Sequence, residues 1–407
     1  MTALDAAGSV SSAAPVSAND AWATPERREL RALVRRFTER EIVPQLEEWE
    51  DAGGLPRALH RRAGELGLLA LGFPKAAGGD GEHLDTALVA EELILAGGSS
   101  GVCAGLFTHG IAAPHIALHG SAELVDRFVR PTLRGELIGS LGITEPGTGS
   151  DVAAITTRAV RDGNATGHAD GDYVVTGAKT FITSGIRADY VTTAVRTGGP
   201  GHRGISLLVV ETDRPGVART RLRKMGWHCS DTATISYDDV RVPATNLVGA
   251  EGSGVPADHG AVRDRAALAR GAGVRDRTAL RRPHHRLARQ RETFGAPLSS
   301  RQVVRHRIAQ MARRAVVART YVRDVLARYE AGADSGDLVP ELAMAKNTAV
   351  EACDWVVDQA VQLHGGAGYL HGVEVERHYR DARILGIGGG TNEIMDEVVA
   401  SRLGLDG

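Results

Sequence analysis

The sequence predicts three domains in the order helical, β-rich and helical. The chain has 407 residues, which is too many for a single small hydrophobic core. Apolar residues recur every three or four positions up to about residue 138 and again after residue 300, which is typical of helices. Between these segments, runs rich in Val, Ile, Thr and Tyr are broken by Gly, Pro and Asp, which is typical of strands. The predicted domains are 24–138, 139–249 and 250–407, after a disordered tail at 1–20.

The N-terminal domain is expected to begin with a capped helix. Thr24 is a suitable N-cap and Pro25 suits the first helical turn. The apolar positions that follow at helical spacing are Leu30, Leu33, Val34 and Phe37. Further short helices are expected at 87–95, 111–118 and 122–129.

The other two domains are delimited by a change in hydrophobic pattern. Strands are expected at 172–177, 189–197, 204–212 and 234–243, which predicts a small antiparallel β domain. Two long helices are expected at 301–330 and 341–364, the second ending at Gly365 and Gly366.

The composition argues against several classes of protein. A net charge of -2 gives no reason to expect a nucleic-acid or membrane partner. Three isolated cysteines fit a reducing compartment. The start lacks the basic and apolar regions of a secretory signal, and no apolar run appears long enough for a membrane span. The sequence therefore predicts a cytoplasmic, soluble protein.

Glycine-rich motifs are the candidate ligand sites. In "LGITEPGTGSDVA" at 141–153, hydroxyls and small residues suit a flat ring or a phosphate, although a structural turn explains the pattern equally well. "TGAKT" lacks P-loop spacing, and no GxGxxG links a strand to a helix, so neither a P-loop nor a Rossmann domain is expected. Gly388, Gly389 and Gly390 leave room for something bulky.

Other candidate groups have simpler interpretations. Gly365 and Gly366 fit a helix cap as well as they fit a function. His284 and His285 are neighbours without a spaced carboxylate partner, so no metal site is expected. His364 is expected to pack at a helix end, and Cys353 is expected in the core.

Six motifs together point to one family. In chain order they are "TEPGTGSD", "GAKTFITSG", "KMGWHCSDT", "RETFG", "QLHGGAGY" and "GGGTNEIM". Their order and spacing resemble the acyl-CoA dehydrogenase family over 24–405. The resemblance implies a helical N-terminal domain, an antiparallel β-barrel-like middle domain and a C-terminal four-helix bundle.

The resemblance also implies FAD bound between the middle and C-terminal domains of a homotetramer. The residues that would line the isoalloxazine are Leu141, Ile143, Thr144, Gly149, Ser150, Phe181, Ile182 and Thr183. Those that would reach FAD across a subunit boundary are Arg291, Thr293, Gln302, Gln362, Gly365 and Gly366. Thr391 and Glu393 would complete the pyrophosphate and adenosine contacts, and Ser150, Gly389 and Gly390 would lie near the acyl-CoA substrate.

The family's chemistry needs a carboxylate base. That base removes the α-proton of an acyl thioester while the β-hydrogen leaves as hydride to flavin N5, and the electrons pass to an electron-transfer flavoprotein. Most members carry the Glu at the position of Gly389 here. A subset that includes the long-chain type has Gly there and places a Glu-Arg pair upstream. The spacing from "RETFG" puts that pair at Arg265 and Ala266, and Arg265 cannot accept a proton.

The segment around Arg265 has an unusual composition. From 261 to 290 it holds nine Arg, two Asp, no Glu and no Lys. Pro283 and two glycines are expected to disrupt a helix there. If Asp264-Arg265-Ala266 is encoded GAC CGA GCG, a reading one base later gives Thr-Glu-Arg. We therefore hypothesise that 255–287 is an out-of-frame segment between compensating indels.

Three functions follow as hypotheses. The first is FAD-dependent dehydrogenation of a medium- or long-chain acyl-CoA, impaired if the printed segment is real. The second is a catalytically silent protein that binds flavin or acyl-CoA. The third is a flavin oxidase or monooxygenase of the same fold.

Overall fold

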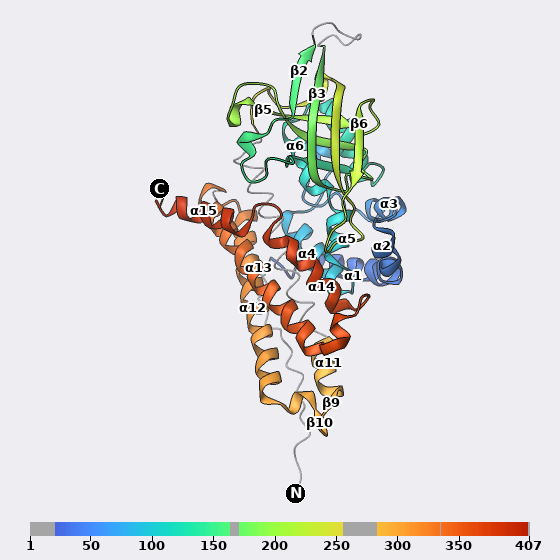
Figure 1. The fold of residues 1–407 in the computed structure, drawn as a ribbon, viewed down its shortest axis with the longest axis vertical. Coiled ribbons are helices and arrows are strands. Elements are labelled where there is room, and N and C mark those ends of the chain that lie inside the picture. Colours follow the sequence, from blue (N-terminus) through green and yellow to red (C-terminus); the bar gives the residue numbers. More distant parts are fainter. Residues whose placement is uncertain (1–20, 163–170, 255–282, 334, 406–407) are drawn as a thin grey trace.

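A computed structural model describes residues 21–162, 171–254, 283–333 and 335–405. The β-rich domain lies at one end of the long axis, and a pair of long helices extends from the middle of the molecule to the other end (Figure 1). The N-terminal helices pack beside both. The three-domain fold predicted from the sequence is confirmed.

The N-terminal domain is a cluster of short helices. Its helices are α1 (Pro25–Phe37), α2 (Leu46–Ala52), α3 (Arg57–Glu65), α4 (His83–Leu95), α5 (Ser100–Leu106), α6 (His109–His119), α7 (Ala122–Leu124) and α8 (Arg130–Leu133). The predicted cap is present, because the Thr24 side chain accepts a hydrogen bond from the Arg27 amide and Pro25 follows as the first helical residue. Val34, Leu59 and Val89 pack in its core.

One stretch of this domain is apolar enough to cross a membrane by length and composition alone. Ser100–His119 has a mean hydropathy of 1.3, which the expectation of no such run overlooked. The stretch consists of α5 and α6, separated at Phe107 and Thr108, and 56% of it is buried inside the protein. That burial is typical of core helices.

The middle domain is one mixed sheet. Its strands are β1 (Gly139–Gly142), β2 (Arg158–Asp162), β3 (Asp172–Thr183), β4 (Tyr190–Arg196), β5 (Ile205–Glu211), β6 (Val217–Arg221), β7 (Thr232–Pro243) and β8 (Leu247–Val248). The order is β6-β7-β3-β2-β4-β5-β8, with β1 paired to β4. Most neighbours are antiparallel, as expected, but β1 runs parallel to β4 and β2 meets β4 at a single parallel pair.

The C-terminal domain is built on two long antiparallel helices. The described elements are α11 (Pro283–Gln290), β9 (Glu292–Thr293), β10 (Ala296–Pro297), α12 (Gln302–Glu330), α13 (Ser335–His364), α14 (Glu374–Ala382) and α15 (Asn392–Arg402). Val325, Leu342 and Cys353 lie in the core between α12 and α13, so the expectation for Cys353 is confirmed. His364 is buried at the end of α13, as expected.

Pro283 is the first described residue of α11. Residues 255–282 lie outside the described residues, so the expectation that Pro283 lies in mid-helix stays a prediction.

Candidate functional site

Two segments of the middle domain form one wall. The Thr180 amide donates to the Thr144 carbonyl at 2.8 Å, and the Ser140 hydroxyl donates to the Thr183 carbonyl at 2.8 Å. These bonds hold 140–145 beside 179–183. The structure thus brings together the two motifs expected to face the isoalloxazine.

A buried ion pair locks this wall from behind. The Lys179 ammonium lies 2.8 Å from Glu145 Oε1, and the two side chains are 0% and 4% exposed. Lys179 also donates to the Ile143 carbonyl at 3.0 Å. Glu145 accepts further bonds from the backbone N–H groups of Thr156 and Thr157, so its oxygens are well satisfied.

The partners of Glu145 set its charge. Burial alone would raise the pKa of Glu145, but the bonds from Lys179, Thr156 and Thr157 outweigh burial and lower the pKa to about 2. Burial lowers the pKa of Lys179 to about 8, although Glu145 opposes that shift. Both groups are therefore charged at neutral pH.

Phe181 presents its ring at the surface of this wall. Its side chain is 68% exposed, and its φ of 60° is left-handed, which is unusual for a non-glycine residue. The register of β3 against β7 shifts between Lys179 and Ile182, so the backbone bulges there. Ile182 points the other way, into the barrel core, and only its backbone is available to a ligand.

The loop after Glu145 leaves open space. A side chain at Gly147 or Gly149 would meet no atom within 4 Å, and Ser150 is exposed. The wall thus carries an exposed aromatic ring, and its segment 140–145 leads into an open glycine loop, which fits a flat, bulky ligand such as the isoalloxazine of FAD.

A second group of expected residues lies at the end of α13. The Arg291 guanidinium donates to the His364 carbonyl at 2.8 Å, directly before Gly365, whose φ is 60°. Gly366 is exposed with free space around it, and Gln362 is exposed nearby on α13. Arg291, Gln362, Gly365 and Gly366 therefore form one cluster.

Thr293 and Gln302 continue this group onto α12. Thr293 accepts a bond from Arg301 through its carbonyl at 2.8 Å. Gln302 lines a cavity of about 500 Å³ between α12 and α13. The other lining residues are Val303, His306, Arg307, Gln310, Trp355 and Gln359.

A third group surrounds the glycine-rich loop before α15. Lys346, 1% exposed on α13, donates to the Gly390 carbonyl at 2.9 Å and to the Asn392 side chain at 2.9 Å. Gly389 and Gly390 have φ values of 66° and 93°, which a larger residue would adopt only with strain.

Thr391 has a structural role in this third group. Its hydroxyl accepts from the Ile394 amide and caps α15, while the neighbouring Glu393 is exposed. The Thr391 carbonyl also accepts from the Met395 amide at 3.0 Å, so both the side chain and the backbone of Thr391 bind the first turn of α15.

The second and third groups are far apart within one chain. Lys346 and His364 lie on the same helix, eighteen residues apart, which corresponds to about 27 Å at the helical rise. One pyrophosphate is much smaller than that distance. The same chain therefore does not bring Arg291 and Thr391 to one phosphate.

Some candidate positions lie outside the described residues. Arg265 and most of 255–287 are among them, as are the side chains of His284 and His285. Among the described residues, no cluster of three or more His, Cys, Asp or Glu side chains has the arrangement of a metal site.

Sequence reasoning missed three residues that organise the site. Glu145 lies in the motif "TEPGTGSD" and Lys179 in "GAKTFITSG", yet nothing in the sequence indicates that the two form an ion pair. Lys346 shows no motif at all. A charged residue within an otherwise apolar helix face, as at Lys346, is the one signal that points to a buried partner.

Comparisons with known proteins agree on a family. Models of the acyl-CoA dehydrogenase N-terminal, middle and C-terminal domains match residues 24–136, 140–240 and 257–404. The long-chain specific acyl-CoA dehydrogenase of Rattus norvegicus mitochondria is 35% identical over 388 residues, covering 92% of this chain and 85% of the relative.

Solved structures agree as well. A probable acyl-CoA dehydrogenase from Mycobacterium abscessus ATCC 19977 / DSM 44196 is 58% identical, with a TM-score of 0.90, and covers 94% of this chain and 100% of that one. A glutaryl-CoA dehydrogenase from Mycobacterium smegmatis in complex with FADH2 is 26% identical, with a TM-score of 0.85, and covers 95% and 96%.

Replacing Glu145 by Gln should destabilise the protein in a pH-dependent way. The folded pKa of Glu145, about 2, lies below the ordinary 4.5, so its stabilisation is complete above pH 4.5 and is lost as pH falls toward 2. Lys179 stays protonated over this window. At pH 7 the variant should lose about 3 kcal/mol of unfolding free energy, measured by urea denaturation.

The matched control is Glu136→Gln, which removes an exposed ion pair with Arg134. This control should leave the urea midpoint nearly unchanged. The difference between wild type and Glu145→Gln should shrink steadily between pH 4.5 and pH 3. A constant difference across that range would contradict the role given to the Glu145 charge.

Proposed function

Because the chain belongs to the acyl-CoA dehydrogenase family, whose cofactor is FAD, we propose that it oxidises a medium- or long-chain acyl-CoA to the trans-2-enoyl-CoA. The proposed electron acceptor is an electron-transfer flavoprotein, and the proposed setting is fatty-acid metabolism in the cytoplasm. The observation that carries the proposal is the wall of 140–145 and 179–183, with Phe181 exposed beside open glycines.

The similarity to a long-chain specific relative supports the chain-length class. The alignment with that relative spans 388 residues and covers 92% of this chain. Gly389 and Gly390 support it too, because they carry no side chain where an acyl thioester would need room.

FAD supplies a hydride acceptor when bound. The chain's own task is to hold the thioester so that its β-hydrogen faces that acceptor and to remove the α-proton. In the proposed arrangement Ser150 and the 389–390 loop border the thioester. Lys346 fixes the loop from behind, since it donates to the Gly390 carbonyl.

The separation along α13 supports shared sites between subunits. The Arg291 cluster and the Thr391 loop are about 27 Å apart in one chain. They serve a single FAD only if each comes from a different copy. We therefore propose a homotetramer in which Arg291, Thr293, Gln302, Gln362, Gly365 and Gly366 reach the neighbour's FAD.

The printed sequence has no carboxylate at either position where the family carries its catalytic base. Position 389 is Gly and position 265 is Arg, and neither accepts a proton. We propose that the active form carries Glu at position 265, as the one-base-shifted reading of 255–287 provides. The catalytically silent binding protein is the alternative that the printed residues favour.

The purified protein should be yellow, with the absorbance bands of bound FAD. The exposed ring of Phe181 and the open glycine loop motivate this expectation. Turnover of acyl-CoA with an artificial acceptor, run under air and under nitrogen, then separates dehydrogenase from oxidase or monooxygenase. A dehydrogenase gives equal rates in both gases and adds activity when an electron-transfer flavoprotein is supplied.

Two results would count against this assignment. Folded protein that stays colourless after incubation with FAD would exclude the flavoprotein function. Turnover that consumes oxygen in proportion to substrate would instead favour the oxidase or monooxygenase.

FAD retention should depend on assembly. Arg291→Ala removes the bond to the His364 carbonyl and the charge beside Gly365, so it should weaken FAD binding by about tenfold or more. Light scattering with absorbance detection gives mass and flavin content together. The control is Arg305→Ala, an exposed arginine of α12 whose guanidinium bonds, among the described residues, to the carbonyls of Ser299 and Ser300. A monomer that holds one FAD per chain would overturn the shared site.

The printed chain should turn over acyl-CoA on the order of 10²–10⁴-fold more slowly than a chain with a competent base. Replacing 255–287 by the one-base-shifted translation should restore turnover and raise the melting temperature. Arg265→Glu alone should recover little, because eight of the nine arginines between 261 and 290 remain. Full activity of the printed chain would mean that another residue is the base, and sequencing the coding DNA across codons 250–295 checks the origin of the segment.

A further inference from the structure

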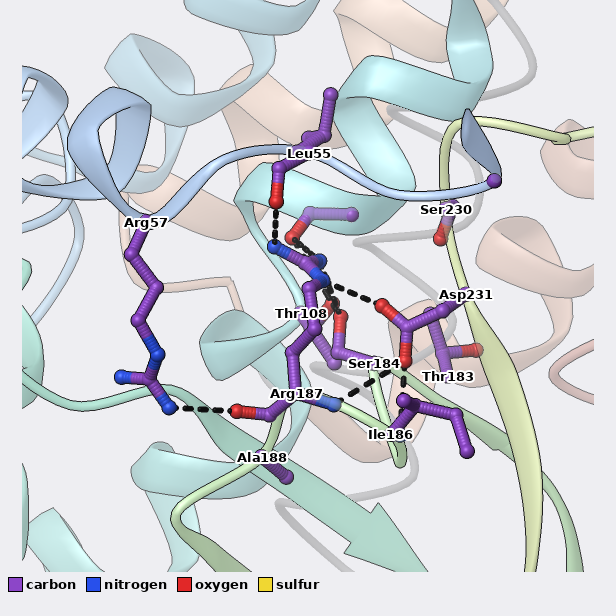
Figure 2. A network of polar contacts seen from close by, with 12 residues as sticks. Leu55, Arg57, Thr108, Thr183, Ser184, Ile186, Arg187, Ala188, Ser230 and Asp231 are labelled. Carbon is purple, nitrogen blue, oxygen red and sulfur yellow. Dashed lines mark hydrogen bonds and ion pairs between the residues drawn. The ribbon is translucent and has the colours of Figure 1, made fainter. Parts of the chain in front are cut away.

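Arg187 occupies the joint between the N-terminal domain and the end of β3. Its side chain is 13% exposed and its Nε bonds to Asp231 Oδ1 at 2.5 Å. Its two other nitrogens reach the N-terminal domain, where they donate to the carbonyls of Leu55 at 2.9 Å and Gly105 at 3.3 Å. Figure 2 shows the guanidinium at the centre of this network.

Ser184, at the end of the flavin-facing wall, has a strained backbone. Its φ is 59°, in the left-handed region that a serine seldom adopts, and it is fully buried. Such a conformation persists only where the surroundings enforce it.

Several hydrogen bonds support the conformation of Ser184. Its carbonyl accepts from the amides of Arg187 at 3.0 Å and Ala188 at 2.8 Å. Its amide donates to the Asp231 carbonyl at 2.8 Å. Its hydroxyl lies 2.7 Å from the Thr108 hydroxyl and accepts from Arg187 at 3.3 Å. Arg187 also pairs with the side chain of Asp231, whose carbonyl accepts the Ser184 amide. Arg187 therefore contacts Ser184 both directly and through Asp231 (Figure 2).

The position of Ser184 controls the residue before it. Thr183 is joined to Ser184 by one planar peptide, and its carbonyl is held by Ser140 at 2.8 Å. A change of φ at Ser184 would rotate that peptide and pull the Thr183 carbonyl away from Ser140. The wall that faces the ligand would then shift at Phe181–Thr183.

If Arg187 only attached the N-terminal domain to the middle domain, Arg57 would serve the same role. Arg57 joins the same domains, because it donates to the Arg187 carbonyl at 2.9 Å and pairs with Asp189. Its side chain is 45% exposed, and within the described part of the chain its guanidinium bonds to Asp189 and the Arg187 carbonyl and not to Ser184. Comparing variants of the two arginines therefore distinguishes attachment of the domains from support of Ser184.

We propose that Arg187 is a positioning residue of the flavin site, which holds Ser184 in its left-handed conformation and so sets where Thr183 meets the isoalloxazine ring. The inference rests on the assignment of Phe181–Thr183 to the flavin face. Asp231 balances the guanidinium charge, so Arg187 acts through geometry and hydrogen bonds.

The test compares Arg187→Met with Arg57→Met in the full-length protein. The absorbance and visible circular dichroism of bound FAD report the flavin surroundings, and amide hydrogen exchange reports the backbone at 181–185. Arg187→Met should shift the flavin bands, release FAD on the order of tenfold faster on dilution, and speed exchange at Ser184. Arg57→Met should leave all three unchanged, and Arg187→Lys should restore part of the flavin signal.

Each outcome bears on the proposal. Arg187→Met protein with wild-type flavin bands and unchanged exchange at Ser184 would overturn it, as would equal effects from Arg57→Met. If Arg187→Met does not fold, Thr108→Val removes the Thr108–Ser184 bond together with the bond from Thr108 to the Ala104 carbonyl, and leaves Arg187 in place. This variant should give the same spectral shift, smaller in size; no shift would refute the proposal. If the wild type binds no FAD, the flavin assignment fails separately, and exchange at Ser184 still decides whether Arg187 holds this turn.

Discussion

The wall formed by 140–145 and 179–183 depends on the buried ion pair between Glu145 and Lys179. The two residues come from segments more than thirty positions apart, and each carries a charge that burial makes costly without the other. The same carboxylate closes the loop that follows, since it accepts the amides of Thr156 and Thr157. A buried pair of this kind specifies one arrangement of two segments more than it adds to stability.

The domain order could be predicted from the sequence because hydrophobic spacing differs between helices and strands. Thr24 and Pro25 marked a helix start because capping is a local property. Strand β6 was not predicted, because it depends on a tertiary contact and not on a local property. Four of its five residues are exposed at a sheet edge, so its sequence lacks the alternating apolar pattern of a half-buried strand. Pairing with β7 is what makes this segment a strand.

The candidate site was only partly predictable for a related reason. Motif order named the residues, but their grouping depends on tertiary distances. Ile182 stands in a flavin motif, yet its side chain lies in the barrel core because neighbours on a strand point to opposite faces. The separation of Arg291 from Thr391 is set by the length of α13, which no motif records.

The length of α13 also has a genetic consequence. In the proposed assembly, this helix carries one half of a binding site at each end, so every complete site would be the joint product of two chains. A copy damaged at Arg291 and another damaged at Gly390 would still assemble some intact sites when produced together. Pairs of inactive alleles would then complement one another, and a single defective allele would impair those sites to which a normal chain and a defective chain each contribute one half.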